Sequence, residues 1–273
     1  FSIYTDALTK DDLALLKRTL DTLEKPYNIE MCYIDTTVFS TFPKLNGSWA
    51  TYYRLYAANN VESDRFLYVD VDILCDIDLA PLNDIDMQGH PIAWVPEAPL
   101  NNAVDFEVAE ELGKCADEYY YNAGVLLVDT KRWKEQNISK RAMTYIAQNS
   151  PAFHDQSALN VICYRNALSL SGYYNSFSND RKNWKQLSKP YGQINRLVHF
   201  LDYPKPWGRL GNFLHPMYDT WSSVLNQTVY LTHYEKHTNK KIEIKNFKRY
   251  KKTLKDKVLF LLYRTGYKNI KGT

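Results

Sequence analysis

Short apolar segments along the chain are separated by longer segments with helical periodicity. Residues 65–69, RFLYV, are apolar or aromatic apart from the first, which is typical of a strand covered on both faces in a parallel sheet. Segments of similar length and character predict the other strands, at residues 1–5, 29–34, 91–95, 123–128 and 196–200.

Helical periodicity is clearest after Thr9, which can cap a helix because Asp12 stands three residues further on, as in a capping box. Leucines recur on one face of this segment, at positions 13, 16, 20 and 23. Further helices are expected at residues 48–59, 104–112, 131–148 and 155–165. Strands that alternate with helices predict an α/β fold in which helices flank a central, mostly parallel sheet.

Charge divides the chain near residue 230. The formal net charge is +3, but residues 235–273 hold 13 Lys and Arg against 3 Asp and Glu, so the preceding part is mildly acidic. Leu254, Val258 and Leu261 are spaced as on one helix face among these lysines. We therefore expect one folded domain over residues 1–230 and a basic, helical tail over residues 231–273. Such a tail suits an acidic surface (anionic lipid, nucleic acid or protein), or it is simply solvated.

The sequence also indicates the cellular setting. No apolar run reaches the length of a membrane span, and nothing resembles a signal peptide, although the chain starts at Phe1 rather than Met. The four cysteines, Cys32, Cys75, Cys115 and Cys163, form no C-x-x-C pair, which argues against zinc-ribbon and thioredoxin-type sites. Three of them lie in or beside apolar runs, which predicts reduced core residues in a cytosolic protein.

Two carboxylates follow the strand predicted at residues 65–69. Asp70 and Asp72 lie at its C-terminal end, where open α/β sheets bind ligands. Residues i and i+2 of a strand point to the same side, so the two carboxylates repel each other unless a cation lies between them. Mg²⁺ and Mn²⁺ suit such oxygen ligands and usually also hold substrate phosphates. The alternative is a pair of acids that cap the next turn.

Two enzyme classes place an acid-x-acid motif after an apolar strand. In haloacid-dehalogenase-type phosphatases the first Asp is the nucleophile, and a Thr or Val stands two residues after the second Asp. Leu74 occupies that position here, and no Gly-Asp-x-x-x-Asp pattern follows. In metal-dependent glycosyltransferases both acids address the metal ion and the donor diphosphate. The remaining motifs have to decide between the two classes.

Six motifs occur together and in a fixed order along the chain. They are TYYRL (51–55), FLYVDVDI (66–73), LAPL (79–82), YYNAGVLLV (120–128), DQSALN (155–160) and HFLDYPKPW (199–207). In content, order and spacing the chain resembles glycosyltransferase family 8, which includes glycogenin-like enzymes and bacterial lipopolysaccharide galactosyl- and glucosyltransferases. The resemblance covers residues 1–210 and implies a GT-A-type, Rossmann-like nucleotide-sugar-binding fold.

The resemblance also implies a set of site residues. Asp70, Asp72 and His199 would ligate Mn²⁺ or Mg²⁺, and Lys205 would contact the donor diphosphate. The positions expected to contact the donor are Arg54, Asp70, Val71, Asp72, Asn122, Ala123, Asp155, Gln156 and Lys205. Several of them have a structural alternative, such as a helix cap and first-turn residue for Asp155 and Gln156.

By resemblance, the reaction transfers a hexose from UDP-glucose or UDP-galactose to a hydroxyl of an oligosaccharide or glycolipid, with retention of configuration. Gln156 would lie beneath the anomeric carbon and Asp155 would hydrogen-bond the sugar hydroxyls, so these are the expected catalytic residues. Because an amide is a poor nucleophile, we expect a front-face reaction in which the leaving diphosphate helps to deprotonate the acceptor hydroxyl. Glu97 and residues 98–106 are candidates for acceptor contacts.

The resemblance sets expectations about place and partners as well. It suggests synthesis of a cell-surface polysaccharide or lipopolysaccharide in the cytoplasm, with the tail on the anionic inner face of the membrane and no nucleic-acid partner. The family's first strand, which holds the nucleotide base, has no counterpart here, so we expect the sequence to be N-terminally trimmed. The alternative function is a non-catalytic nucleotide-sugar-binding protein that kept the motifs but lost the base pocket.

Overall fold

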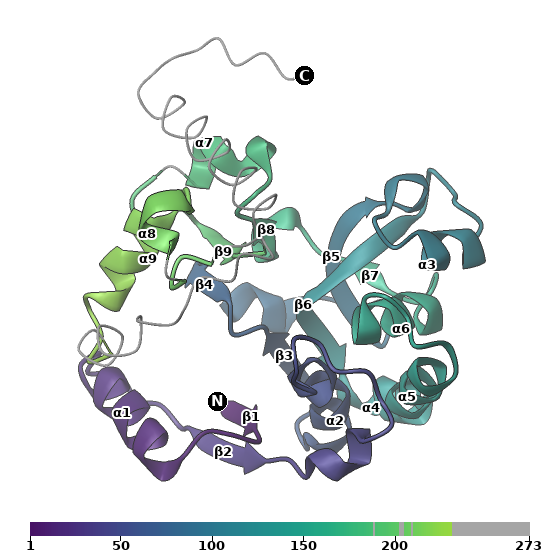
Figure 1. Cartoon of the computed structure of the whole chain (residues 1–273), viewed down its shortest axis with the longest axis horizontal. Coiled ribbons are helices and arrows are strands. Elements are labelled where there is room, and N and C mark those ends of the chain that lie inside the picture. The colour runs from purple at the N-terminus through teal and green to yellow at the C-terminus, as the bar shows by residue number, and fades with distance from the viewer. Residues whose placement is uncertain (188, 202–204, 209, 231–273) are drawn as a thin grey trace. The chain divides into compact units, whose positions relative to one another are not determined.

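The chain divides into two compact units. The computed structural model describes residues 1–187, 189–201, 205–208 and 210–230 (Figure 1). Unit 1 comprises Phe1–Thr9, Tyr27–Asp70 and Leu79–Tyr174. Unit 2 comprises Lys10–Pro26, Val71–Asp78 and the residues from Asn175 onward.

Unit 1 contains a four-stranded mixed sheet and a separate parallel pair of strands. The four-stranded sheet has the order β3-β6-β5-β7, and the parallel pair is β1 with β2. The strands are β1 Ser2–Thr5, β2 Glu30–Tyr33, β3 Arg65–Val69, β5 Ile92–Pro99, β6 Tyr119–Asp129 and β7 Leu168–Ser169. β6 runs antiparallel to both β3 and β5, whereas β7 runs parallel to β5. The sheet is thus organised around β6, most of whose residues are buried.

The predicted α/β fold is confirmed, but the sheets are mixed, and the expectation of a mostly parallel sheet around residues 65–69 is wrong. β3 pairs with the antiparallel β6, from Arg65 opposite Asp129 to Val69 opposite Val125. All five residues of β3 are only half-buried. An apolar sequence reflects how much of a strand is covered, and it does not encode the direction of the neighbouring strand.

Helices of unit 1 pack on the sheet, and alternate residues of its strands point into two different cores, one on each face. The helices are α2 Tyr53–Asn60, α3 Phe106–Glu111, α4 Thr130–Glu135, α5 Ile138–Asn149 and α6 His154–Ile162. Trp94 and Leu126 face the core formed with α2, α4, α5 and α6. Ala93 and Leu127 face the opposite side, where they pack with Leu82. This alternation with period two is what a sheet covered on both faces requires.

The predicted helix at residues 131–148 is interrupted in the structure. It consists of α4 and α5, separated at Asn137, whose φ of 52° lies in the left-handed region. Asparagine adopts this conformation more readily than most residues, so it can end one helix and start another. The expected helix at residues 48–59 begins as a 3₁₀ turn, Ala50–Tyr52, before α2.

Unit 2 has a small mixed sheet of its own. Its order is β4-β9-β8, with β4 antiparallel and β8 parallel to β9. Its elements are α1 Lys10–Asp21, β4 Ile73–Asp76, β8 Ser176–Phe177, α7 Trp184–Leu187, β9 Arg196–His199, α8 Gly211–Leu214 and α9 Tyr218–Leu225. Leu74 and Val198 of the sheet pack with Phe200 and Met217. The sequence did not predict β4 and β8, because two to four residues carry too little periodicity.

The sequence also predicts a basic tail and no membrane-spanning segment. The tail at residues 231–273, including Leu254, Val258 and Leu261, lies outside the described residues. None of the helices in the described part of the chain has the length and apolar character that a membrane crossing requires.

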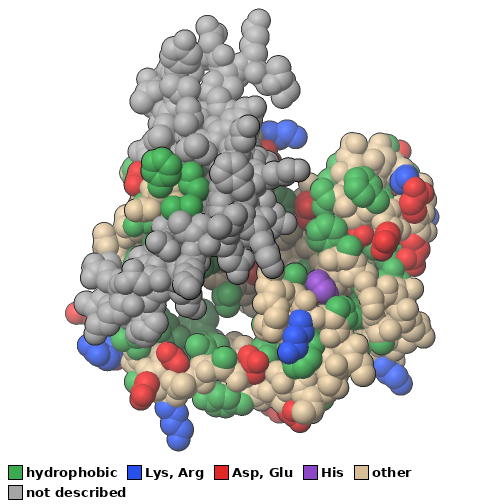
Figure 2. All heavy atoms as spheres, viewed as in Figure 1, with side chains coloured by type: hydrophobic (Ala, Val, Ile, Leu, Met, Phe, Trp, Pro, Cys, Tyr) green, Lys and Arg blue, Asp and Glu red, His purple; other side chains and the backbone are tan. Residues whose placement is uncertain are grey.

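All four cysteines are free, but only Cys163 is a core residue, so the expectation of a core role is wrong for the exposed Cys75. Charged side chains of both signs are scattered over the face drawn in Figure 2.

A buried serine links three helices of unit 1. Ser139 in α5 donates a hydrogen bond from Oγ to the carbonyl oxygen of Leu55 in α2, at 2.6 Å. Ser139 Oγ in turn accepts a hydrogen bond from Nε1 of Trp133 in α4, at 2.8 Å. Because Ser139 and Trp133 are fully buried, water cannot replace either bond.

We expect Ser139→Ala to lower the free energy of unfolding by roughly 1–3 kcal/mol, because the Leu55 carbonyl and the Trp133 indole stay buried without their partner. Urea denaturation measures this change. Ser40→Ala is the control, since Ser40 is exposed and such a substitution costs at most about 0.5 kcal/mol. Equal losses for the two variants would contradict the role of Ser139.

Candidate functional site

The guanidinium of Arg54 holds two carboxylates of unit 1. Arg54 lies in α2 with its side chain 8% exposed, and its Nη2 is 2.9 Å from Asp70 Oδ1. Its Nε is 2.9 Å from Asp155 Oδ2. Nη1 also donates to the carbonyl oxygen of Ala123 in β6. One buried cation therefore joins the end of β3, the first turn of α6 and the middle of β6.

Two hydroxyls complete these ion pairs. Tyr68 OH donates to Asp70 Oδ1 at 2.6 Å, and Thr51 Oγ1 donates to Asp155 Oδ1. Burial raises the pKa of Asp155, while the charge of Arg54 and the hydrogen bond from Thr51 oppose this rise. The Asp155 side chain is 2% exposed and the Asp70 side chain 22%. Asp155 is thus enclosed, whereas Asp70 remains accessible to a ligand.

The side-chain amide of Gln156, in the first turn of α6, is held at both ends. Its Oε1 accepts from the backbone N–H of Ala123 at 2.9 Å. Its Nε2 donates to Tyr120 OH at 3.2 Å and to Glu97 Oε2 at 3.4 Å. Glu97 also accepts from Asn122 Nδ2 at 3.1 Å. Strands β5 and β6 therefore deliver Glu97 and Ala123 to the same amide, and Asn122 binds it indirectly through Glu97.

Unit 2 places a histidine against Asp72. Ile73 pairs with His199 across the β4–β9 ladder, and the N–H of Phe200 donates to the Asp72 carbonyl at 3.0 Å. His199 Nε2 lies 3.2 Å from Asp72 Oδ1, and its Nδ1 lies 2.9 Å from Asn175 Oδ1. Because an amide oxygen only accepts, we assign one ring proton to Nδ1; the charged form of the ring carries a second proton on Nε2, which can donate to Asp72. This leaves Nε2 as the nitrogen that faces Asp72.

Lys205 supplies the counter-charge of Asp72. Its Nζ is 2.7 Å from Asp72 Oδ2 and also donates to the carbonyl oxygen of Leu201 at 3.1 Å. Burial raises the pKa of Asp72, but the hydrogen bonds and charges of His199 and Lys205 outweigh it, and the pKa falls well below its usual range. Gly211 allows the backbone to pass close to Lys205, since a Cβ on Gly211 would lie within 2.6 Å of the Lys205 carbonyl oxygen.

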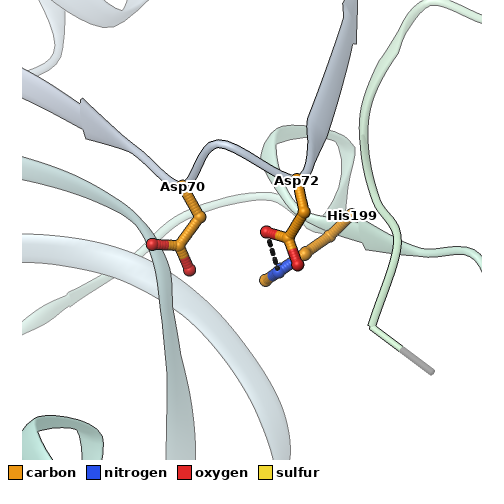
Figure 3. A group of neighbouring side chains, drawn as sticks. All are labelled: Asp70, Asp72 and His199. Atoms are coloured by element: carbon orange, nitrogen blue, oxygen red, sulfur yellow. Dashed lines mark ion pairs between the residues drawn. The ribbon is translucent and has the colours of Figure 1, made fainter. Parts of the chain in front are cut away.

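Asp70 and Asp72 are separated by one residue where the chain passes from unit 1 to unit 2. One carboxylate oxygen of each and a ring nitrogen of His199 all lie within 4.8 Å of one another (Figure 3). Two carboxylates and an imidazole whose other nitrogen is engaged by Asn175 fit a divalent cation such as Mn²⁺ or Mg²⁺. The three side chains form a candidate metal site.

The residues expected from the sequence fall into these two groups, with one exception. Arg54, Asp70, Asn122, Ala123, Asp155 and Gln156 meet in unit 1, and Asp72, His199 and Lys205 meet in unit 2. The side chain of Val71 is fully exposed.

The sequence did not single out three side chains that complete these groups. Thr51 and Tyr68 lie inside two of the motifs, which could have drawn attention to them. Asn175 lies outside every motif. It reaches His199 only because it directly precedes β8, which pairs with β9.

Comparison with known proteins identifies relatives of known class. Residues 1–211 match the family described as glycosyl transferase family 8. The chain is 29% identical to the glycosyltransferase GlyF of Streptococcus pneumoniae, over 89% of this chain and 60% of GlyF. It is 26% identical to the lipopolysaccharide 1,3-galactosyltransferase of Salmonella typhimurium, over 78% of this chain and 65% of that enzyme. The chain thus spans less than two thirds of the length of either relative.

Solved structures share the fold at low sequence identity. The galactosyltransferase LgtC, solved with donor and acceptor sugar analogues, is 21% identical with a TM-score of 0.65, over 91% of this chain and 88% of LgtC. The apo glycosyltransferase GlyE of Streptococcus pneumoniae is 18% identical with a TM-score of 0.54, over 85% of this chain and 55% of GlyE. These similarities confirm the GT-A-type fold.

The family match covers well over half of the chain and decides against the phosphatase alternative. The six motifs, the GT-A-type fold and the candidate Asp-Asp-His site agree with it. The chain therefore belongs to glycosyl transferase family 8.

Proposed function

We propose that this chain is a retaining, metal-dependent glycosyltransferase that moves a hexose from UDP-glucose or UDP-galactose to a hydroxyl of an oligosaccharide or glycolipid. The observation that carries this proposal is the grouping of Asp70, Asp72 and His199, with Lys205 on Asp72. Such ligands beside a lysine suit a divalent cation that carries a diphosphate. The proposal includes a role in making a cell-surface polysaccharide or lipopolysaccharide in the cytoplasm, since relatives that this chain spans only in part include a lipopolysaccharide galactosyltransferase.

In this proposal Asp70, Asp72 and His199 hold Mn²⁺ or Mg²⁺. Asn175 orients His199 by binding its Nδ1, so that Nε2 is available as a ligand. A bound divalent cation supplies Lewis-acid neutralisation of the charge on the departing nucleoside diphosphate. Lys205 adds a point charge beside Asp72, where it can meet the same diphosphate.

The residues of unit 1 bind and orient the donor sugar in this proposal. Asn122 and Ala123 present an amide and backbone groups beside Gln156, while Glu97 is available to acceptor or sugar hydroxyls. The enclosed Asp155 keeps Arg54, and through it Asp70, in place. A direct contact between Asp155 and the sugar hydroxyls stays a prediction, because Thr51 and Arg54 already occupy its oxygens.

The proposed chemical step is a front-face displacement. A bond forms between the acceptor oxygen and the anomeric carbon, and the bond from that carbon to the diphosphate oxygen breaks. The acceptor proton passes to the leaving diphosphate. Gln156 does not attack in this scheme, since an amide is a poor nucleophile, and its fixed dipole instead stabilises positive charge that develops at the anomeric carbon.

The function is tested by a donor screen. We expect UDP-glucose or UDP-galactose, screened beside UDP-GlcNAc, to release its sugar with Mn²⁺, and none of the three to do so with excess EDTA. Asp72→Asn should lower this release by about 100-fold or more, because it removes a carboxylate of the candidate metal site. The control is Asp84→Asn, an exposed carboxylate of unit 1. Wild-type activity of Asp72→Asn would refute the metal assignment, and donor binding without release would favour the non-catalytic alternative.

The placement of Gln156 makes a second prediction. We expect Gln156→Ala to reduce kcat roughly tenfold or more while the donor KM changes little, since its amide acts on the reacting carbon rather than on ground-state binding. Steady-state kinetics and calorimetric titration of UDP with Mn²⁺ separate the two effects. Weaker donor binding with unchanged turnover would contradict this placement.

The basic tail makes a third prediction. Residues 235–273 carry 13 Lys and Arg against 3 Asp and Glu, so the intact chain should bind phosphatidylserine-containing vesicles at low salt and detach at high salt. Vesicle sedimentation measures both. A chain that ends at residue 240 should bind weakly, and equal binding of the two chains would exclude membrane contact through the tail.

A further inference from the structure

Asp105 is a buried carboxylate beside the proposed reaction centre. It is 1% exposed and lies among Leu100, Val108 and Tyr120, in the loop that leads into α3. Its Oδ1 accepts from the N–H of Val108 at 3.4 Å and so caps α3. Enclosing a carboxylate is costly unless hydrogen-bond donors surround it.

The second oxygen of Asp105 accepts from two hydroxyls. Tyr120 OH donates to Asp105 Oδ2 at 3.0 Å, and Ser157 Oγ donates to the same oxygen at 2.5 Å. Burial and the charge of Asp105 both raise the pKa of Tyr120, so its phenol keeps its proton. A phenol has one proton, and here it points to Asp105. The phenol oxygen is left as an acceptor.

That acceptor meets Gln156 Nε2, at 3.2 Å. Glu97 also accepts from Nε2, and the Ala123 N–H donates to Oε1. The three partners therefore all require the same orientation of the amide. The chain of hydrogen bonds runs in one direction only, from Gln156 through Tyr120 to Asp105.

We propose that Asp105 and Tyr120 are positioning residues that fix the orientation of the Gln156 amide for transfer. Asp105 imposes the direction of the Tyr120 hydroxyl, and Tyr120 then acts with Glu97 and the Ala123 N–H to fix which end of the amide faces it. Gln156 is the residue assigned to the anomeric carbon, so this inference rests on the proposed function. An amide turned end for end would present the opposite dipole to the reacting carbon.

The test compares Tyr120→Phe with the matched variant Tyr145→Phe. Tyr145 OH also donates to a carboxylate of unit 1, Glu111 Oε2 at 2.6 Å, but on the surface. We expect Tyr120→Phe to lower kcat about tenfold with little change in the donor KM, because only the transition state uses the amide dipole. Tyr145→Phe should leave both constants unchanged. Asp105→Asn, which can donate to Tyr120, should also lower kcat.

A double-mutant cycle separates positioning from a general structural role. If Tyr120 acts through Gln156, Tyr120→Phe should cost nothing further in a Gln156→Ala background, so the two losses should not add. Full additivity would overturn the proposal. Thermal melting of each variant checks that the fold is intact.

A second measurement keeps this inference separate from the proposed function. The side-chain NH₂ signals of Gln156, assigned by their loss in Gln156→Ala, should shift in Tyr120→Phe and not in Tyr145→Phe. This holds whether or not the protein transfers sugar. Absent transfer by the wild type would refute the proposed function alone, whereas unchanged Gln156 signals in Tyr120→Phe would refute the positioning role.

Discussion

Buried carboxylates are unfavourable unless a cation neutralises them, and in unit 1 the buried guanidinium of Arg54 does so. Arg54 binds Asp70 and Asp155 and donates to the carbonyl of Ala123. A pair of this kind adds little net stability, but the loss of one partner leaves an unmatched buried charge and is strongly destabilising. The arrangement therefore specifies one geometry for α2, β3, β6 and α6, which are the elements that carry the candidate site.

Enclosure also distinguishes the three carboxylates. Asp155 is surrounded by Arg54 and Thr51 and supports the site from within. Asp70 and Asp72 each have a cation beside them, yet their side chains are 22% and 21% exposed. Those two remain able to accept a metal ion, which agrees with membership of a glycosyltransferase family and with the proposed chemistry.

The hydrogen-bond network extends from the Arg54 ion pairs through Ala123 to the side-chain amide of Gln156. The carboxylate of Glu97 accepts from the Gln156 amide, and the N–H of Ala123 donates to it. Tyr120 accepts from the same amide and donates to the carboxylate of Asp105. Such a network is specific only when every member is satisfied. The site thus depends also on Asp105 and Tyr120, which do not themselves meet the substrate in the proposed scheme.

The sequence by itself determined the α/β class, the bounds of the strand at residues 65–69 and the family motifs that carry Asp70, Asp72, Gln156 and His199. These are local features, since burial, periodicity and motif spacing are written in neighbouring residues. The tertiary structure decided the antiparallel direction of β3, the contact of Asn175 with His199 and the chain from Asp105 to Gln156. Thr51 and Asp155 are 104 positions apart, and no local pattern relates them. Partners of this kind are chosen by how the strands and helices pack, because a buried polar group bonds to whatever the fold brings within reach.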